Sequence, residues 1–266
     1  MQVSQIFIYP VKSLGGIALS AAKVLERGLA LDRRWMIVDE NGLFLSQREH
    51  PKMALFRLEL ATDGFSITYL NDTIHVPFNW QDSYPRKKVK VWNDECDALV
   101  GPMPINKWFS DHLEQACSLV YMPDDSIRTI NLKYAREGDK VSFADGYPLL
   151  FLGQASLDHL NSKLVEKVDI HRFRPNIVFT GGRSNEEEAW RSFRVGEVEF
   201  RGIKACARCQ MITINQDTSI RNPEPLKVLS DYQKRGNSVL FGLSASLQHR
   251  TDAGRLIHIG DSIAVS

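Results

Sequence analysis

Apolar and polar residues alternate in short runs through the first hundred residues. Such runs occur at 35–39, 43–46, 55–60, 65–69, 73–76 and 88–92. Alternation with a period of two is typical of β-strands. Asn41-Gly42 and Asp63-Gly64 separate the first two pairs of runs and supply the positive φ of tight hairpin turns. A third pair is predicted from 73–76 to 88–92, so this half is expected to be an antiparallel barrel or sandwich.

Three segments have helical spacing. The first is capped by Asn106 and places Trp108, Phe109 and Leu113 on one face, and the other two open at Ser156 and Pro225. Further strands are predicted at 176–180, 193–195, 198–201, 211–214 and within 255–265. The fold class is therefore predicted to be mostly β with a few helices (α+β). A soft boundary at 118–124 divides the chain into domains 1–120 and 121–266.

Composition narrows the functional classes. With 33 basic and 32 acidic residues among 266, the net charge is +1, so nucleic-acid binding is not predicted. The N-terminal stretch lacks a basic n-region and a long apolar h-region, and no apolar run approaches the length that spans a membrane. The sequence therefore predicts a cytoplasmic protein without a membrane span.

Four cysteines are too few for a disulfide scaffold, and Cys96 and Cys117 are predicted to be core thiols. Cys206 and Cys209 flank Arg208 before an apolar run that is predicted to be a buried strand. Four interpretations of these two cysteines are open. They could be core thiols, zinc ligands or a redox pair, or one of them could be a thiolate that binds a soft metal whose other ligands come from a cofactor. A structural zinc site needs four ligands, and the sequence offers no second Cys or His pair at suitable spacing. A redox pair should lie at the start of a helix, whereas this pair precedes a predicted strand. In the single-thiolate interpretation, Arg208 helps to keep the sulfur of Cys209 deprotonated.

Several cationic and polar residues suit an anionic cofactor. Lys12 and Ser13 end one predicted strand, and Arg33 begins another, which are positions suited to phosphate. Taken alone, each of Lys12 and Arg33 fits a solvated strand end better than a phosphate site. Arg174 and Asn176 interrupt an apolar run, where an unpaired guanidinium or amide would be costly. A polar partner is therefore expected for them.

Asp145 lies in the segment Phe143–Pro148, and its position before Gly146 indicates a turn. Its first predicted role is to form that turn, and its second is to contact a ligand.

Six motifs, taken in order, resemble the signature set of the MOSC superfamily, which comprises the C-terminal domains of molybdenum-cofactor sulfurases and their relatives. The motifs lie at Tyr9–Ser13, Asp32–Trp35, Phe143–Pro148, Phe173–Asn176, Glu188–Trp190 and Cys206–Cys209. The resemblance spans nearly the whole chain. It implies a MOSC N-terminal β-barrel over 1–120 and a MOSC-type β-barrel over 121–266. Within the superfamily, the likeness is closest to the mitochondrial amidoxime-reducing components and to bacterial reductases of N-hydroxylated bases.

The resemblance also implies roles for the motif residues. Cys209 would ligate molybdenum, with Arg208 beside it. Lys12, Ser13 and Arg33 would hold the phosphate of molybdopterin. Arg174 and Asn176 would contact the pterin, with Asp145 in the same site. Asn215 stands where the family usually has aspartate, which leaves its role open, and no role is assigned to Cys206.

The implied activity is a molybdenum-cofactor oxidoreductase that reduces N-hydroxylated compounds such as amidoximes, hydroxylamines and N-hydroxylated bases. No ferredoxin-type cysteine cluster is found in the chain, so electrons are expected from a separate electron-transfer protein or reductase. The alternative is a carrier of sulfur or of the molybdenum cofactor, with a persulfide on Cys209 or Cys206. A non-catalytic β-barrel protein is a third possibility.

Overall fold

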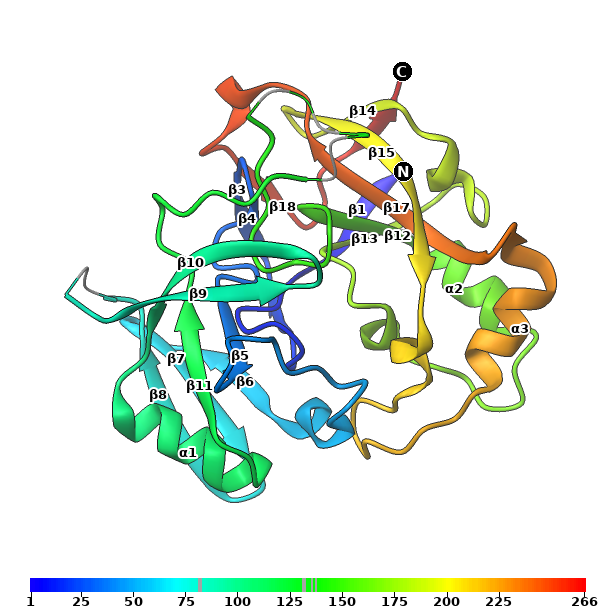
Figure 1. The fold of residues 1–266 in the computed structure, drawn as a ribbon. Coiled ribbons are helices and arrows are strands. Elements are labelled where there is room, and N and C mark those ends of the chain that lie inside the picture. The colour runs from blue at the N-terminus through cyan, green and yellow to red at the C-terminus, as the bar shows by residue number, and fades with distance from the viewer. Residues whose placement is uncertain (81–82, 131–132, 135, 137) are drawn as a thin grey trace.

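The computed structural model describes residues 1–266 apart from 81–82, 131–132, 135 and 137. In the described residues the chain is mostly β-strand, with one large sheet, three smaller sheets and three α-helices (Figure 1). The predicted fold class, mostly β with a few helices, is confirmed. Among the described residues, no helix combines the length and the apolar character needed to cross a membrane.

The large sheet joins the start of the chain to its second half. Its order is β19 (Ile263–Val265), β14 (Ser192–Val195), β15 (Val198–Arg208), β17 (Ser238–Leu247), β12 (Leu149–Gly153), β13 (Ile177–Thr180), β1 (Gln2–Ile8) and β2 (Ile17–Leu19), with β16 (Lys234–Arg235) paired to β17. β12 and β13 are parallel, and β1 runs antiparallel to β13 with Ile6 opposite Ile177. The predicted division into 1–120 and 121–266 stays a prediction.

Three smaller sheets use strands mostly from the first half. They are β5 (Trp35–Asp39), β11 (Cys117–Tyr121), β10 (Asp94–Val100) and β9 (Arg86–Val91); β18 (Leu256–His258), β3 (Ala21–Leu25) and β4 (Gly28–Leu29); and β6 (Arg57–Leu60), β7 (Gly64–Tyr69) and β8 (Asp72–Pro77).

Two predictions about the strands of the first half were wrong. The predicted third pair does not form, because β8 pairs with β7 and β9 pairs with β10, each across a two-residue turn. Leu70 and Trp92 open these turns with positive φ although neither is glycine, so the turns carried no Gly signal. The run 43–46 makes only isolated bridges at Leu43 and Phe44.

The helices lie at the edges of the sheets (Figure 1). The α-helices are α1 (Met103–Leu113), α2 (Gln154–Asn161) and α3 (Glu224–Gln233), and the 3₁₀ turns are η1 (Pro51–Leu55), η2 (Ile170–Phe173), η3 (Glu186–Ala189), η4 (Gln210–Thr213) and η5 (Arg250–Asp252). Asn106 was wrongly predicted to cap the first helix, which begins three residues earlier, after Pro102. Its side chain instead donates to the Gly101 carbonyl and accepts from the Leu119 N–H, which fixes α1 to β11.

The prediction of a strand at 211–214 is also wrong, because residues 211–213 lie in the 3₁₀ turn η4 and Ile214 makes only an isolated bridge to Arg221. The carbonyls of this run find partners other than a neighbouring strand. Arg172 donates to the carbonyls of Ile212 and Thr213, and the Thr213 hydroxyl donates to the Gln210 carbonyl. Local side chains therefore satisfy the backbone in a turn, and an apolar run of four residues does not distinguish this case from a strand.

β15 changes register twice against β17. Gly202 faces Ala245 but Lys204 faces Ser244, so Ile203 is an extra residue on β15. Such a bulge shifts the following side chains to the other face of the strand. Val198, Phe200 and Gly202 are buried, whereas Lys204, Cys206 and Arg208 line a pocket. The second shift leaves an extra residue on β17 near Gly242, which has a φ of +80°.

Gly242 is predicted to be essential to this second bulge. A Cβ added there would lie 2.8 Å from the carbonyl oxygen of Phe151, whereas one added at Gly236, with φ +58°, would meet nothing within 4 Å. We expect Gly242→Ala to lower the free energy of unfolding by about 2–4 kcal/mol, from backbone strain plus overpacking. The matched Gly236→Ala should cost about 1 kcal/mol, from strain alone. Urea unfolding measures both, and equal losses would contradict a steric role for Gly242.

Candidate functional site

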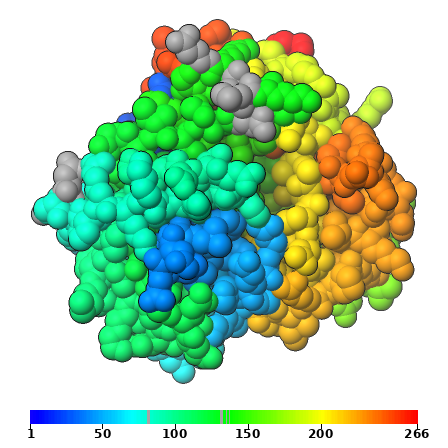
Figure 2. Space-filling model, in the orientation of Figure 1, coloured from blue at the N-terminus to red at the C-terminus, as the bar shows by residue number. Residues whose placement is uncertain are grey.

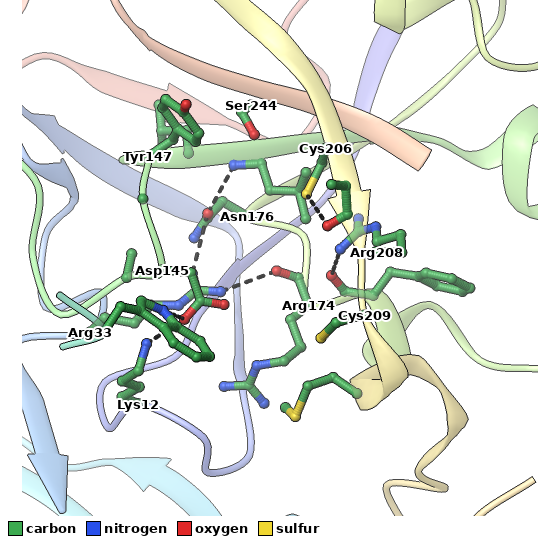
Figure 3. Close-up of a pocket in the computed structure, with 18 of the residues that line it drawn as sticks. Lys12, Arg33, Asp145, Tyr147, Arg174, Asn176, Cys206, Arg208, Cys209 and Ser244 are labelled. Carbon is green, nitrogen blue, oxygen red and sulfur yellow. Dashed lines mark hydrogen bonds and ion pairs between the residues drawn. The ribbon is translucent and has the colours of Figure 1, made fainter. Parts of the chain in front are cut away.

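A pocket of about 790 Å³ lies where segments from the two halves of the chain meet. The space-filling view shows the blue-to-green half against the yellow-to-orange half along this seam (Figure 2). The structure brings every residue predicted for the site to this pocket, namely Lys12, Ser13, Arg33, Asp145, Arg174, Asn176, Arg208 and Cys209. Cys206 lines it as well (Figure 3). Their roles toward a ligand stay predictions.

Backbone hydrogen bonds bring the separate motifs together. The N–H of Arg33 donates to the Tyr9 carbonyl at 2.8 Å, and the N–H of Lys12 donates to the Trp35 carbonyl at 2.8 Å. The N–H of Phe143 in turn donates to the Arg33 carbonyl at 2.9 Å. The three segments therefore cross at one wall of the pocket, and each sends a charged side chain toward it.

Lys12 is buried and forms an ion pair with Asp145, with Nζ 2.5 Å from Oδ1. Lys12 Nζ also donates to the Phe143 carbonyl, and Trp92 Nε1 donates to the same carboxylate oxygen at 3.2 Å. Burial lowers the pKa of Lys12, against the attraction of Asp145. Desolvation acts to raise the pKa of Asp145, but the Lys12 ammonium outweighs it and holds this pKa well below its ordinary value. Asp145 therefore positions Lys12 at the pocket wall.

Arg33 is held by a buried carboxylate. Its Nη1 contacts both oxygens of Asp32, at 2.9 and 2.7 Å, and its Nη2 donates to the Arg174 carbonyl. The Asn176 amide oxygen accepts from Arg33 Nη1 at 3.3 Å and from the Leu150 N–H at 3.1 Å. The Asn176 amide nitrogen donates to the Phe7 carbonyl at 3.2 Å, so the polar partners expected for Asn176 are the Arg33 guanidinium and the backbones of β12 and β1.

Two guanidinium groups share one aromatic ring at the floor of the pocket. The Cζ atoms of Arg33 and Arg174 each lie 4.3 Å from the centroid of the Tyr9 ring. Burial, together with the charge of Arg33, lowers the pKa of Arg174 to about 10. Arg174 therefore stays cationic at neutral pH, and its repulsion with the Arg33 guanidinium favours a bound anion near the two groups.

Three of the site residues have left-handed backbones. The φ angles are +70° at Ser13, +50° at Arg33 and +55° at Arg174, although none of the three is glycine. Such conformations cost of order 1–3 kcal/mol each and persist where the surroundings fix them, commonly at ligand sites. Ser13 and Arg33 lie with Lys12 in the two loops that form one side of the pocket, which we call the cationic wall (Lys12, Ser13 and Arg33), and Arg174 lies in a third loop.

The Cys-x-Arg-Cys segment ends β15 and begins η4. Arg208 donates from Nε to the Phe241 carbonyl at 2.9 Å and from Nη1 to the Phe173 carbonyl at 3.0 Å. These bonds fix the strand end, after which Cys209 is exposed and Cys206 is half-buried. Cys96 and Cys117 are buried as predicted, and burial raises the pKa of Cys96 to about 11. The two thiols of the pocket are therefore the accessible ones.

The pocket is suited to an anion. Arg174 Nη2 and Arg208 Nη2 are buried and have no hydrogen-bond partner among the described residues. Buried donors are normally paired, so an unpaired guanidinium nitrogen on each of two residues that line one pocket favours an acceptor there. Among the described residues, no group of three or more His, Cys, Asp or Glu side chains gathers as a metal site.

Sequence reasoning missed several residues of the pocket. They include Trp92, Tyr147, Lys204 and Ser244. Tyr147 lay within the Phe143–Pro148 motif without being selected. Lys204 gave no signal, because the bulge at Ile203 decides that it shares a face with Ser244 across the strand pair. Asn215 does not line the pocket, and its side chain accepts from the N–H groups of Asp217 and Thr218.

Comparison with known proteins places these motifs in a family. Residues 1–116 match the MOSC N-terminal beta barrel domain and residues 138–264 match the MOSC domain. Mitochondrial amidoxime-reducing component 1 of Mus musculus is 32% identical over 243 residues, which cover 87% of this chain and 71% of that protein. Its Homo sapiens counterpart is 31% identical, with 90% and 77% covered.

A molybdenum cofactor sulfurase of Oryza sativa subsp. japonica is 27% identical over 99% of this chain. The chain spans only 35% of that longer protein. The predicted resemblance is confirmed. Because both MOSC domains are matched in order along most of its length, the chain belongs to the MOSC family.

Proposed function

We propose that the protein binds the molybdenum cofactor and reduces N-hydroxylated compounds, with electrons from a separate protein. One observation carries the proposal: Arg174 and Arg208, whose buried Nη2 atoms have no hydrogen-bond partner among the described residues, line the same pocket as the exposed Cys209. An anionic cofactor that also needs one protein thiolate matches this combination. Relatives named amidoxime-reducing components and molybdenum cofactor sulfurases support it.

The residues of the pocket fit the parts of molybdopterin. Lys12, Ser13 and Arg33 would hold its phosphate, because they form the cationic wall, where Asp145 is paired with Lys12 and Asp32 with Arg33. Arg174 and Asn176 would contact the pterin. Cys209 would be the protein ligand of the metal, and Arg208 keeps the segment in place through the Phe173 and Phe241 carbonyls.

The protein contributes orientation and charge to the reaction. When bound, the molybdenum cofactor supplies the two-electron chemistry that cleaves the N–O bond of the substrate and, with two protons, releases water. The guanidinium groups of Arg174 and Arg208 would stabilise negative charge near the reacting centre, and their burial would strengthen this attraction. The two electrons are expected from a partner that docks briefly at the pocket through a small polar interface.

A second candidate is a carrier of sulfur or of the cofactor. The exposure of Cys209 and the sulfurase relatives favour it, since a persulfide carrier needs an accessible thiol. Cysteine-bound sulfane sulfur without molybdenum in the purified protein would support this candidate. The cytoplasmic location stays a prediction, since two of the relatives are mitochondrial by name.

Turnover assays test the proposed function directly. Protein purified from a host that makes the cofactor should contain about one molybdenum per chain and should reduce benzamidoxime with reduced viologen as donor. NAD(P)H alone should not sustain turnover, because the described chain offers no relay between a nicotinamide and the pocket. Steady turnover with NAD(P)H alone would contradict the need for a partner.

Cys209→Ala is predicted to abolish both molybdenum retention and benzamidoxime reduction. Cys206→Ala should retain most of the metal, because only one protein sulfur is needed beside the two of the cofactor. Elemental analysis of the two purified variants provides the measurement. Equal loss of molybdenum from both would instead indicate a two-thiol site.

Arg174→Gln is predicted to weaken cofactor binding by about 10- to 100-fold, because a hydrogen bond to a charged group contributes about 1.5–3 kcal/mol. The matched control is Arg183→Gln, which changes an exposed arginine outside the pocket. Pterin and molybdenum content after extensive dialysis gives the readout, with thermal unfolding as a check on the fold. Unchanged retention in Arg174→Gln would remove this residue from the cofactor site.

A further inference from the structure

One end of the pocket is unused by the proposed cofactor site. Tyr147 and Ser244 lie on the far side of Asn176 from Lys12 (Figure 3). Lys204 lines the same pocket, and its Nζ lies 5.2 Å from the ring centroids of both Tyr147 and Tyr134. This end therefore holds an ammonium group between aromatic rings, apart from the cationic wall at Lys12.

The bulge at Ile203 fixes the relation between Lys204 and Ser244. These two residues are directly opposite each other in the β15–β17 register, so their side chains share one face of the sheet. In a regular strand, positions 202 and 204 would share one face, so the bulge is what turns Lys204 away from the buried face of Gly202. The backbone thus places a lysine and a serine hydroxyl side by side at the pocket.

Lys204 has no acidic partner in the part of the chain that the structure describes. The acidic residues that line the pocket are Asp94 and Asp145. Asp94 is paired with Arg128 at 2.9 Å, and Asp145 with Lys12 at 2.5 Å. Contacts to aromatic faces contribute only about 0.5–1 kcal/mol at such sites, so they leave the ammonium available to an anion.

Tyr147 adds a second donor. Burial raises the pKa of its phenol, although the charge of Lys204 opposes the rise, so the group stays a neutral O–H donor at physiological pH. Together with the Ser244 hydroxyl and the Lys204 ammonium, it offers three donors and no fixed negative charge. A carboxylate, which accepts several hydrogen bonds, matches this set.

The distance along the strand suits a small substrate. Lys204 and Cys209 are five residues apart, which is at most about 17 Å between their Cα atoms at 3.3–3.4 Å per residue. The two side chains and a ring-sized compound can bridge such a span. Cys206, which lies between them on the strand, lines the same pocket.

We propose that Lys204, Tyr147 and Ser244 bind the carboxylate of an N-hydroxylated substrate, so that the enzyme prefers substrates carrying a negative charge at the end remote from the N–O bond. This inference rests on the proposed reductase function and names its substrate class. It assigns Lys204 a role in specificity, separate from cofactor binding.

The test compares benzamidoxime with 4-carboxybenzamidoxime on the holoenzyme. The ratio of kcat/KM values should favour the carboxylated compound by about 10- to 100-fold in the natural protein, as expected for one hydrogen-bonded charge pair. Lys204→Met should bring the ratio near one, and Lys204→Arg should restore most of it. Lys227→Met, at an exposed lysine on α3, is the matched control and should leave the ratio unchanged.

Binding provides a readout independent of turnover. Calorimetry with 4-carboxybenzamidine, the product, should show weaker binding to Lys204→Met than to the natural protein or to Lys227→Met. If the natural protein reduces neither compound, the proposed reductase function fails, and calorimetry alone then decides the carboxylate site. If it reduces both compounds equally well and binding is unchanged in Lys204→Met, the carboxylate site is wrong and the reductase function stands. Loss of molybdenum from Lys204→Met would assign this lysine to the cofactor and overturn the proposal.

Discussion

The rest of this structure depends on one constraint, which is that several partly buried cations lie close together in one pocket. Cations brought together repel, and burial weakens the solvation that would otherwise stabilise them. In this protein, Asp32 pairs with Arg33 and Asp145 pairs with Lys12. The Tyr9 ring and backbone carbonyls stabilise the guanidinium groups further. Asp32 is buried in this arrangement, so its negative charge is in turn stabilised by the Arg33 guanidinium.

The same constraint explains the conformation of the backbone around the pocket. Carbonyl groups must turn toward the guanidinium groups, and loops with left-handed residues achieve this where a regular strand would not. Arg174 is one such residue, and its carbonyl accepts from Arg33. The Asn176 carbonyl accepts from the Phe7 N–H at 2.8 Å, which ties this loop to β1. Pairing of β1 with β13 therefore positions two of the motifs together.

Features that a short segment shows by itself made part of the fold and of the site predictable from the sequence. Alternation and Gly-containing turns located five strands of the first half, β5 to β9, and the motif residues could be recognised individually because their side chains carry distinctive charge. Strand pairing was less predictable, because β8 pairs with β7 and β9 pairs with β10 across turns that begin at Leu70 and Trp92, which are not typical turn residues. Lys204 was missed for a related reason. Its face is set by one extra residue on β15 relative to β17, a property of two strands that neither strand shows alone.

The long reach between β1 and β13 has a consequence for synthesis. Ser4 donates to the Val178 carbonyl, 174 residues further along the chain. A ribosome that adds 5–20 residues per second needs about 10–35 s to make that stretch. Throughout this interval β1 has only β2 beside it, and its other edge is open to wrong partners. Contacts of such high sequence separation also slow folding itself. The strand leading to Tyr9 is thus translated long before its final neighbour, and the pocket floor can form only after both are in place.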